Sequence, residues 1–516
     1  MRRATSAILQ FAVPALLLVL TAVPAQANWV ASGTFLYQDR ELDSTGFTGV
    51  ISQKPVRFAD VDIYDPGRHA GTIANGKTDA NGAFSITVTD SAVRTIRVRV
   101  FSKTNNTSDL FVRVTNQSSS VYAGVSGDVI NHNPNTNVNF GTMVATVGGG
   151  GEVFNIFDQA VYGADFVKVI KGTRPSQLVT LKWAINGGVG VSSTSGSTIT
   201  LRDTAGYDDM PILHEWGHYV MNNYSKQTSP GGTHYLSDCN EDLRLSFDEG
   251  RASSFGLSVR RYYGMPLANV YVKTDGGSGP GHAVNWYDLE DATQYPCTGD
   301  TSEVSISRTI WDICDSASTT DMTPGVEDSQ DRLALADSEV WQVYTGPIKS
   351  ATYVTDESFW DGWFDPTVAN GYFSEMKDDF GLYQIEFWQD AYEPNNTVAL
   401  ATPINANDTP LHLTYFYDPD GNGKGEADID IFKLTATSGK VYTIETLNLL
   451  SDANTYLELL DTNGTTVLAS NDNRSSSDPS SIIVWTAPRS AVFYVRSKHA
   501  TDIGKYGSYD LRVTAP

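Results

Sequence analysis

Cysteine and histidine are both scarce in this chain of 516 residues, which contains three cysteines and eight histidines. Cys239, Cys297 and Cys314 all lie in the middle of the chain, and no two of them form a CxxC pair. The spacing therefore argues against a zinc site built from clustered thiolates. Three cysteines permit one disulfide with one thiol left over. We favour Cys239 with Cys297, since both lie in loop-like sequence, although the sequence leaves the connectivity open.

Basic residues are also few. The chain has 36 Lys and Arg against 60 Asp and Glu, which gives a formal net charge of -24 and a sequence pI near 4.6. Such a charge disfavours contact with nucleic acid or with an anionic membrane surface. It favours solubility outside the cell and the capture of hard cations such as calcium.

Long apolar runs are absent beyond the N-terminus, so no later segment is expected to cross a membrane. Residues 1–27 are typical of a secretory signal peptide. The positive start is Arg2 and Arg3, and an apolar stretch follows from Ala7 to Val23. Small residues then occupy the cleavage positions, Ala25 to Ala27. An uncleaved anchor is the alternative, but the apolar stretch is short and ends in a cleavage pattern. We expect a secreted, extracellular protein, with the periplasm or cell surface as other destinations.

The length is too great for one hydrophobic core and predicts about three domains. Residues 28–145 are predicted to be all-β, because residues 55–64 and 96–100 alternate between apolar and polar side chains. The turn signal at residues 79–82 precedes a further strand at residues 83–88. This pattern resembles the transthyretin-like domain found beside carboxypeptidases, which implies a small β-sandwich without chemistry of its own.

A second β-domain is predicted after the central region, over residues 389–516. Its sequence is rich in Asp, Asn, Thr and Ser and contains short strands separated by turn signals. The segments "DAYEPNNT", "ADIDIFKLTATSGKVYTIET", "YLELLDTNGTTVLASNDN", "FYVRS" and "YGSYDLRV" occur in that order and resemble the bacterial pre-peptidase C-terminal domain. The resemblance implies a jelly-roll-like β-sandwich of the kind appended to secreted peptidases.

The central region, residues 150–388, carries the motif with the clearest chemistry. Residues 208–221 are predicted to form a helix, with Asp208 or Asp209 as its cap. His214 and His218 are four residues apart, so both imidazoles leave the same face one turn apart and can reach one zinc ion. Glu215 can then contact the attacking water as the catalytic base without being a ligand. The alternative is a helix with two surface histidines, against which the apolar context argues.

A third ligand is needed, and no HxxGxxH extension follows His218. An acid on a later helix is therefore expected, and residues 245–252 fit that requirement. "ILHEWGHYV" followed by "FDEGRASSF" resembles the gluzincin peptidases, and residues 301–312 resemble a helix of fungalysin-like enzymes. The resemblance implies Glu249 as the third ligand, with Glu241 and Asp242 as competitors.

The resemblance is incomplete beside the predicted ligand. Ser253 stands where thermolysin-like enzymes place an Asp that orients a ligand histidine. We expect Asp248 to take that orienting role instead.

Peptide hydrolysis also needs a donor for the oxyanion. His282, in a Gly-rich loop, is our first choice for this catalytic role. The other candidates are His234, Tyr262, Tyr263 and Tyr287, and an ordinary loop histidine is the alternative for His282.

Calcium is a second expected metal. Asp418, Asp420 and Asn422 place oxygen atoms at alternate positions before a Gly turn, like the start of an EF-hand loop. Ile429 occupies the position of the usual Glu, so Asp428 or Asp430 would have to complete the site. A solvated turn is the alternative.

These observations predict a multidomain protein with an N-terminal β-sandwich, a central α+β zincin-like peptidase domain and a C-terminal β-sandwich. The predicted function is that of a secreted, monomeric zinc endopeptidase acting on protein or peptide substrates. The alternatives are an extracellular binding module with an inactive zincin domain, and a zinc hydrolase of non-protein amides.

Overall fold

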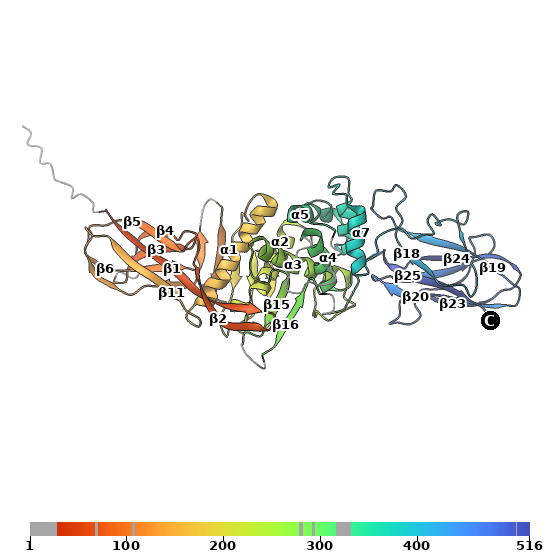
Figure 1. The fold of residues 1–516 in the computed structure, drawn as a ribbon, viewed down its shortest axis with the longest axis horizontal. Coiled ribbons are helices and arrows are strands. Elements are labelled where there is room, and N and C mark those ends of the chain that lie inside the picture. Colours follow the sequence, from red (N-terminus) through yellow and green to blue (C-terminus); the bar gives the residue numbers. More distant parts are fainter. Residues whose placement is uncertain are drawn as a thin grey trace, which may run out of the picture.

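The computed structural model describes residues 28–67, 71–105, 109–277, 282–291, 295–315, 332–501 and 503–516. They form an elongated molecule with a β-rich region at each end and the helices in the middle (Figure 1). The expected multidomain arrangement is confirmed at this level. The predicted signal peptide, residues 1–27, lies outside the described residues.

None of the helices in these ranges combines the length and the apolar character that crossing a bilayer requires.

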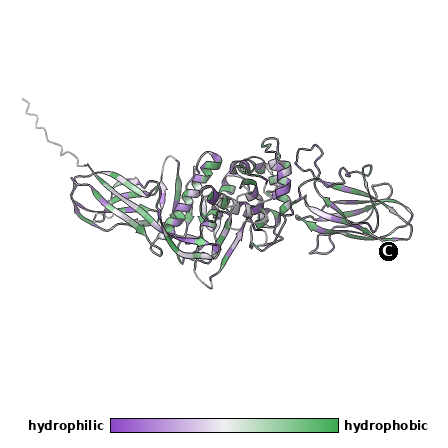
Figure 2. Cartoon of the chain, in the orientation of Figure 1, coloured by the Kyte–Doolittle hydropathy of each residue, from purple (hydrophilic) through white to green (hydrophobic). Residues whose placement is uncertain are grey.

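Two sheets make up the N-terminal region. In the first, the long strand β1 pairs with β2, β5 and β11; in the second, the order is β10-β6-β3-β4, with β9 also on β6. Buried and exposed residues alternate along β5 and β6, and Figure 2 shows hydrophilic and hydrophobic bands alternating along these strands. The strands are β1 (Asn28–Asp43), β2 (Gly46–Pro55), β3 (Asp60–Asp65), β4 (Gly71–Lys77), β5 (Ala83–Thr89), β6 (Arg94–Phe101), β9 (Ala123–Val125), β10 (Val129–His132) and β11 (Val138–Ala145).

A third sheet crosses the domain boundary that the sequence suggested. Its order is β13-β14-β12-β8-β7, and its strands are β7 (Lys103–Asn105), β8 (Phe111–Thr115), β12 (Val179–Lys182), β13 (Ser193–Ser195) and β14 (Thr198–Thr200). Strand β8 pairs in parallel with β12, so part of the predicted N-terminal domain belongs to the sheet of the central region. A parallel partner distant in sequence leaves no local signal. Strand β13, antiparallel to β14, lies at the edge of this sheet.

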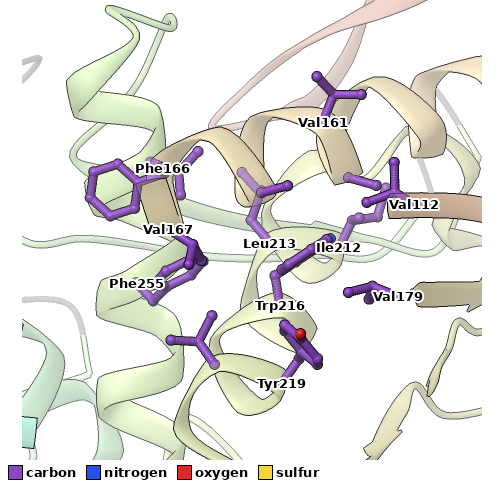
Figure 3. Packing of buried hydrophobic residues seen from close by; sticks show 14 of the residues in the cluster. Val112, Val161, Phe166, Val167, Val179, Ile212, Leu213, Trp216, Tyr219 and Phe255 are labelled. Carbon is purple, nitrogen blue, oxygen red and sulfur yellow. The ribbon is translucent and has the colours of Figure 1, made fainter. Parts of the chain in front are cut away.

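The central region contains the seven α-helices of the described residues. They are α1 (Gly151–Lys171), α2 (Asp209–Tyr224), α3 (Leu243–Tyr262), α4 (Glu303–Cys314), α5 (Asp337–Thr345), α6 (Asp356–Trp363) and α7 (Phe373–Leu382), with 3-10 turns η1 (Ala205–Tyr207) and η2 (Pro347–Ser350) and the hairpin β15 (Val270–Thr274) and β16 (Val284–Asp288). Phe166 of α1, Trp216 of α2 and Phe255 of α3 pack together (Figure 3). This core continues into the N-terminal sandwich, since Trp29 and Phe35 belong to the same cluster.

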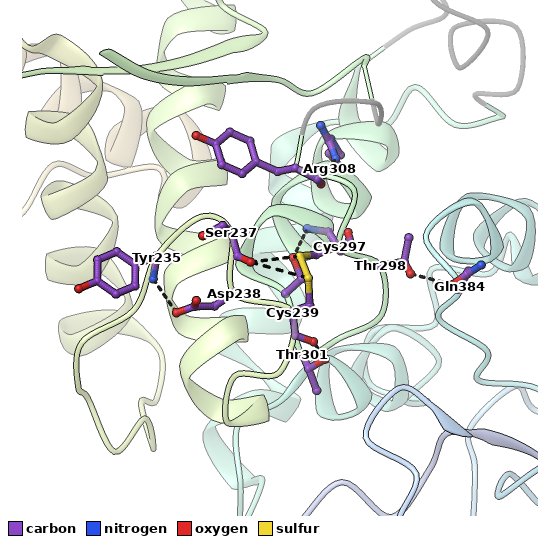
Figure 4. Close-up of a disulfide and its surroundings, with 12 residues drawn as sticks. Tyr235, Ser237, Asp238, Cys239, Cys297, Thr298, Thr301, Arg308 and Gln384 are labelled. Atoms are coloured by element: carbon purple, nitrogen blue, oxygen red, sulfur yellow. Dashed lines mark hydrogen bonds between the residues drawn. A yellow bond between two sulfur atoms is a disulfide. The ribbon is translucent and has the colours of Figure 1, made fainter. Parts of the chain in front are cut away.

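One disulfide fixes two loops of the central region. Cys239 and Cys297 are bonded, with their Cα atoms 5.0 Å apart, as favoured from the sequence (Figure 4). Cys314 is a free thiol. The bond joins the loop before α3 to the loop before α4, and Thr301 Oγ1 adds a hydrogen bond to the Cys239 carbonyl at 2.9 Å. The starts of both helices are therefore held together.

The C-terminal region is a pair of sheets with its own core. The orders are β17-β19-β24-β21-β22 and β18-β25-β20-β23, and side chains such as Phe432, Ile444 and Leu511 fill the space between them. The strands are β17 (Thr402–Ile404), β18 (Leu411–Thr414), β19 (Ile429–Ala436), β20 (Val441–Leu450), β21 (Thr455–Leu460), β22 (Val467–Asn471), β23 (Ile482–Thr486), β24 (Ala491–His499) and β25 (Ser508–Thr514).

Candidate metal centre

Helix α2 presents its two histidines on the side opposite its core contacts. Leu213, Trp216 and Val220 are buried, as the periodicity predicted. Asp208 is the N-cap residue, one of the two predicted, but its side chain accepts no hydrogen bond from the helix. The carboxylate of Asp208 instead accepts hydrogen bonds from the amide and hydroxyl of Thr274, at 3.2 and 2.8 Å, and pairs with Arg202.

The two imidazoles and the carboxylate of Glu249 converge on one point. His214 Nε2 and His218 Nε2 lie 3.1 Å apart, and each lies 3.1 Å from Glu249 Oε2. These three residues form a group whose ligand atoms could hold one metal ion. An ion about 2.0–2.1 Å from all three atoms fits zinc with nitrogen and oxygen ligands and leaves a fourth tetrahedral position open.

Two glycines let α3 pack closely against its neighbours α2 and α4. A Cβ at Gly217 of α2 would lie 2.5 Å from the carbonyl oxygen of Ala252 in α3. A Cβ at Gly250 of α3 would lie 2.5 Å from Ile306 Cβ in α4. Any larger side chain would push these helices apart. Gly217 thus lets α2, with its two histidines, approach α3, which carries Glu249, and Gly250 lets α3 pack closely on α4.

Each imidazole is oriented through its other nitrogen. His214 Nδ1 lies 2.9 Å from Ser253 Oγ, and His218 Nδ1 lies 3.4 Å from Asp248 Oδ2. Asp248 is itself held by the fully buried Arg251, at 2.8 Å. Partners of this kind fix the ring and its tautomer, so that Nε2 faces the metal position. The structure thus places Asp248 where the sequence predicted it and Ser253 beside the other histidine.

The electrostatics of the centre favour a positive charge between these groups. Burial disfavours the charged form of both Glu249 and His218, but their mutual attraction outweighs it. The pKa of Glu249 is held well below its ordinary value, and the pKa of His218 well above. The Glu249 carboxylate would attract a metal cation in the same way, and His218 would bind the metal in its neutral form.

The competing acids have other surroundings. Asp242 caps α3 by accepting the amide of Arg244 at 3.0 Å. Glu241 is buried, and burial followed by the nearby charge of Asp238 raises its pKa to about 7. Neither belongs to the group formed with the histidines of α2.

A second potential ligand group adjoins the first. His234 Nε2 lies 3.4 Å from Glu249 Oε2 and 3.9 Å from Glu303 Oε2. Glu303 opens α4, and burial together with the charges of Glu249 and Glu241 raises its pKa well above the ordinary value. The sequence singled out His234 as a candidate donor but did not place Glu303 in the site.

The centre opens into a cleft of about 560 Å³. Glu215 lines it, and its Oε2 accepts a hydrogen bond of 2.6 Å from Thr194 Oγ1 on the edge strand β13. Tyr271 and Lys273 of β15 line the cleft as well. Thr194, Tyr271 and Lys273 had no sequence signal, because strands distant in the chain bring them here.

His282 does not join the centre. Its ring is 45% exposed and pairs with Asp275 across the β15–β16 hairpin, with Nδ1 3.1 Å from Oδ1. It is not among the described residues that line the cleft. The expectation that His282 donates to the oxyanion is therefore corrected, since its ring lies against Asp275 and not in the cleft.

The other candidates for the oxyanion donor lie in different surroundings. Tyr287 is buried, with its hydroxyl 2.8 Å from Ser307 Oγ, Tyr262 is exposed, and Tyr263 packs on Tyr162. His234 alone of the four alternatives is among the lining residues described, and Tyr271 joins it as a new candidate.

The predicted calcium residues belong to two different places. Asp418, Asp420 and Asn422 form an exposed turn whose oxygens accept backbone amides of the same turn, such as Gly423 N at 2.8 Å from Asp418 Oδ2. Asp430 is buried and groups with Asp390 and Glu393 as potential ligands. The predicted single site is therefore wrong, because β19 buries Asp430 inside the sandwich, close to Asp390 and Glu393.

The carboxylates around Asp430 are unfavourably crowded. Asn395 Nδ2 donates to Asp430 Oδ1 at 3.0 Å, and Tyr509 donates to Oδ2 at 2.5 Å. Burial and neighbouring acids raise the pKa of Asp428 and of Asp430 well above the ordinary value, and the pKa of Glu393 to about 7. Oxygen donors without nitrogen or sulfur suit calcium.

Comparison with known proteins adds little to this geometry. No protein-family model matches the chain, and no curated protein matches it. Among solved structures, the pre-peptidase C-terminal domain of a collagenase from Bacillus anthracis is similar over 22% of this chain and 94% of that chain, with 18% identity and a TM-score of 0.18. A periplasmic inhibitor of g-type lysozyme from Aeromonas hydrophila covers 22% and 97%, with 12% identity and a TM-score of 0.17. These likenesses are weak and limited in extent.

Proposed function

We propose that the protein is a secreted zinc-dependent endopeptidase. The observation that carries the proposal is the triangle of His214 Nε2, His218 Nε2 and Glu249 Oε2, with all three separations at 3.1 Å. Two imidazoles and one carboxylate are a donor set of catalytic zinc sites. When bound, zinc would polarise the scissile carbonyl and lower the pKa of the attacking water.

The side chains around the centre would carry the proton transfers. Glu215 would accept the proton of the attacking water and deliver it to the leaving amine. The 2.6 Å hydrogen bond from Thr194 holds one Glu215 oxygen in place. Tyr271 and His234 line the cleft and could donate to the oxyanion. Burial, followed by the charges of neighbouring groups, raises the pKa of Tyr271 well above its ordinary value, which keeps its phenol protonated.

An extended peptide suits the wall of the cleft. Strand β13 lies at the edge of its sheet, and Ser193 and Thr194 line the cleft beside Glu215. A free strand edge can pair with a substrate backbone and hold it extended. This supports protein or peptide substrates over small amides.

The decisive test compares two variants with the wild type in zinc content and casein hydrolysis, with and without chelator. Glu215→Gln should retain zinc and lose about 10²–10⁴-fold in kcat/KM. Glu249→Ala should lose zinc and activity together. Glu426→Gln, on an exposed residue, is the matched control and should resemble the wild type. Full peptidase activity in Glu215→Gln would show that the assigned base is wrong.

The same measurements separate the alternatives. A binding module with an inactive zincin domain would retain zinc but leave casein intact. A hydrolase of non-protein amides would also leave casein intact but cleave small amides in a chelator-sensitive way.

A further inference from the structure

His234 and Glu303 bring a second set of ligand atoms to the cleft that holds the first centre. His234 Nε2 lies 3.4 Å from Glu249 Oε2 and 3.9 Å from Glu303 Oε2, and the three ligand atoms all lie within 4.8 Å of one another. Two ligand atoms of one tetrahedral zinc ion stand about 3.3–3.4 Å apart, given metal distances of about 2.0–2.1 Å. The first separation matches this value, and small side-chain rotations would bring the Glu303 oxygen into range.

This set of ligand atoms requires an ion of its own. Among the described residues, His234 groups with Glu249 and Glu303 but with neither histidine of α2. His234 in this position is therefore not a fourth ligand of the first centre. Glu249 is common to both groups, and a carboxylate has two oxygens with about four lone-pair sites, so it can serve two neighbouring ions.

The ring of His234 is turned so that one nitrogen faces the two carboxylates. Its Nδ1 lies 3.3 Å from the carbonyl oxygen of Gly232. In the tautomer that donates a proton from Nδ1 to this carbonyl, Nε2 carries the lone pair that a metal needs. The side chain is 31% exposed and lines the cleft, so an ion can reach Nε2 from solvent.

The disulfide holds the segments that carry the two added ligands. Cys239 follows His234 in the loop before α3, and Cys297 precedes Glu303 in the loop before α4 (Figure 4). The hydrogen bond from Thr301 Oγ1 to the Cys239 carbonyl, at 2.9 Å, joins the same two loops. Ligands on segments fixed in this way are already in place before an ion binds.

The donor atoms and the local charge favour zinc. One imidazole nitrogen and two carboxylates suit zinc, whereas calcium and magnesium prefer oxygen ligands alone. Glu249 and Glu303 are 8% and 5% exposed. Two buried carboxylates so close together repel each other unless a cation or a proton lies between them. The imidazole beside them makes this group different from a cluster of acids alone.

We propose that His234, Glu303 and the shared carboxylate of Glu249 bind a second zinc ion beside the catalytic one. The inference rests on the proposed function through Glu249, which serves the first ion there. Two divalent cations in neighbouring positions repel, so the second ion should bind more weakly and fill its site only at higher free zinc. While bound, it occupies Nε2 of His234, which leaves Tyr271 as the remaining candidate donor to the oxyanion.

The test measures the zinc bound per full-length chain by equilibrium dialysis at increasing free zinc, with thermal unfolding as the check that each variant folds. The wild type should bind one ion tightly and a second at higher free zinc. His234→Ala and Glu303→Gln should each keep the tight ion and lose the second. His282→Ala removes a histidine that is 45% exposed and does not line the cleft, so this control should bind two ions like the wild type.

Three outcomes would overturn the proposal. The wild type could saturate at one ion, both variants could bind two ions with wild-type affinity, or His234→Ala could lose the tight ion, which would place His234 in the first centre. Glu215→Gln keeps every ligand of both ions and should bind two, whether or not the wild type hydrolyses casein. A failure of the peptidase proposal therefore leaves the zinc count interpretable.

Discussion

The centre on α2 and α3 and the acid cluster around Asp430 use different donors and have different access. The first combines two imidazoles with one carboxylate and opens into a cleft of about 560 Å³. The second contains carboxylates only, and Asn395 and Tyr509 hydrogen-bond directly to Asp430. Mixed donors beside open space suit chemistry, whereas oxygen donors packed in a sandwich suit structural calcium. The comparison predicts that activity depends on the first centre and stability on the second.

The largest effect is expected from His218→Ala. The variant should lose zinc, and casein hydrolysis should fall on the order of 10³-fold or more, because one of three ligands is missing. Zinc content and kcat/KM check this. Asp430→Asn, in the separate C-terminal cluster, should leave both unchanged. Full zinc occupancy in His218→Ala would place the metal elsewhere.

The next largest effect is expected from the residues that orient the two histidines, Asp248 and Ser253. Asp248→Asn removes the charge that faces His218 and pairs with the buried Arg251, which keeps its hydrogen bond to the Lys226 carbonyl. We expect zinc affinity to fall roughly 10–100-fold. Ser253→Ala, which removes a neutral hydroxyl from His214, should have the smaller effect of the two. Competition with a zinc chelator measures both, and equal effects would mean that the charge of Asp248 contributes nothing.

The close contact between α2 and α3 at Gly217 should tolerate no larger side chain without a loss of stability. Gly217→Ala places a methyl group against the backbone of Ala252 and should lower stability by about 1–3 kcal/mol. Zinc affinity should fall with it, because α2 carries both histidines. Thermal unfolding with and without zinc checks this. Gly381→Ala, at an exposed helical glycine of α7 where an added Cβ makes only an ordinary contact at 3.6 Å, is the matched control.

What the sequence could predict depended on how local each signal was. His214 and His218 share a face because of helical spacing alone, so their proximity followed from the chain itself. Glu249 could be predicted as the third ligand because its helix follows the histidine helix closely in the sequence and a family resemblance implied this role. The Cys239–Cys297 bond also matched the expectation, since both loops lead into neighbouring helices.

The rest depended on long-range pairing. Thr194 reaches Glu215 only because β14 pairs with β12, and β8 joins that sheet across an expected domain boundary. His282 was expected to donate to the oxyanion, but its ring lies beside Asp275. Asp430 was grouped with Asp418 by nearness in sequence, whereas its partners Asp390 and Glu393 come from an earlier segment. Sheet register fixes all three placements and leaves no short-range pattern.

The smallest effect is a pH dependence confined to the C-terminal sandwich. Burial raises the pKa of Glu393 from 4.5 to about 7 in the folded chain, while the unfolded chain keeps an ordinary value. The folded state therefore holds its proton more tightly, and without calcium its stability should fall as the pH rises from about 4.5 to about 7. Calcium should remove this fall, because the cation favours the ionised carboxylates. Hydrogen exchange of β19 across this pH range, with and without calcium, measures the effect. Glu393→Gln should make the calcium-free profile less steep between about pH 4.5 and 7, while the raised pKa values of Asp428 and Asp430 leave part of the fall in place. A profile that rises with pH in the calcium-free wild type would contradict the assignment.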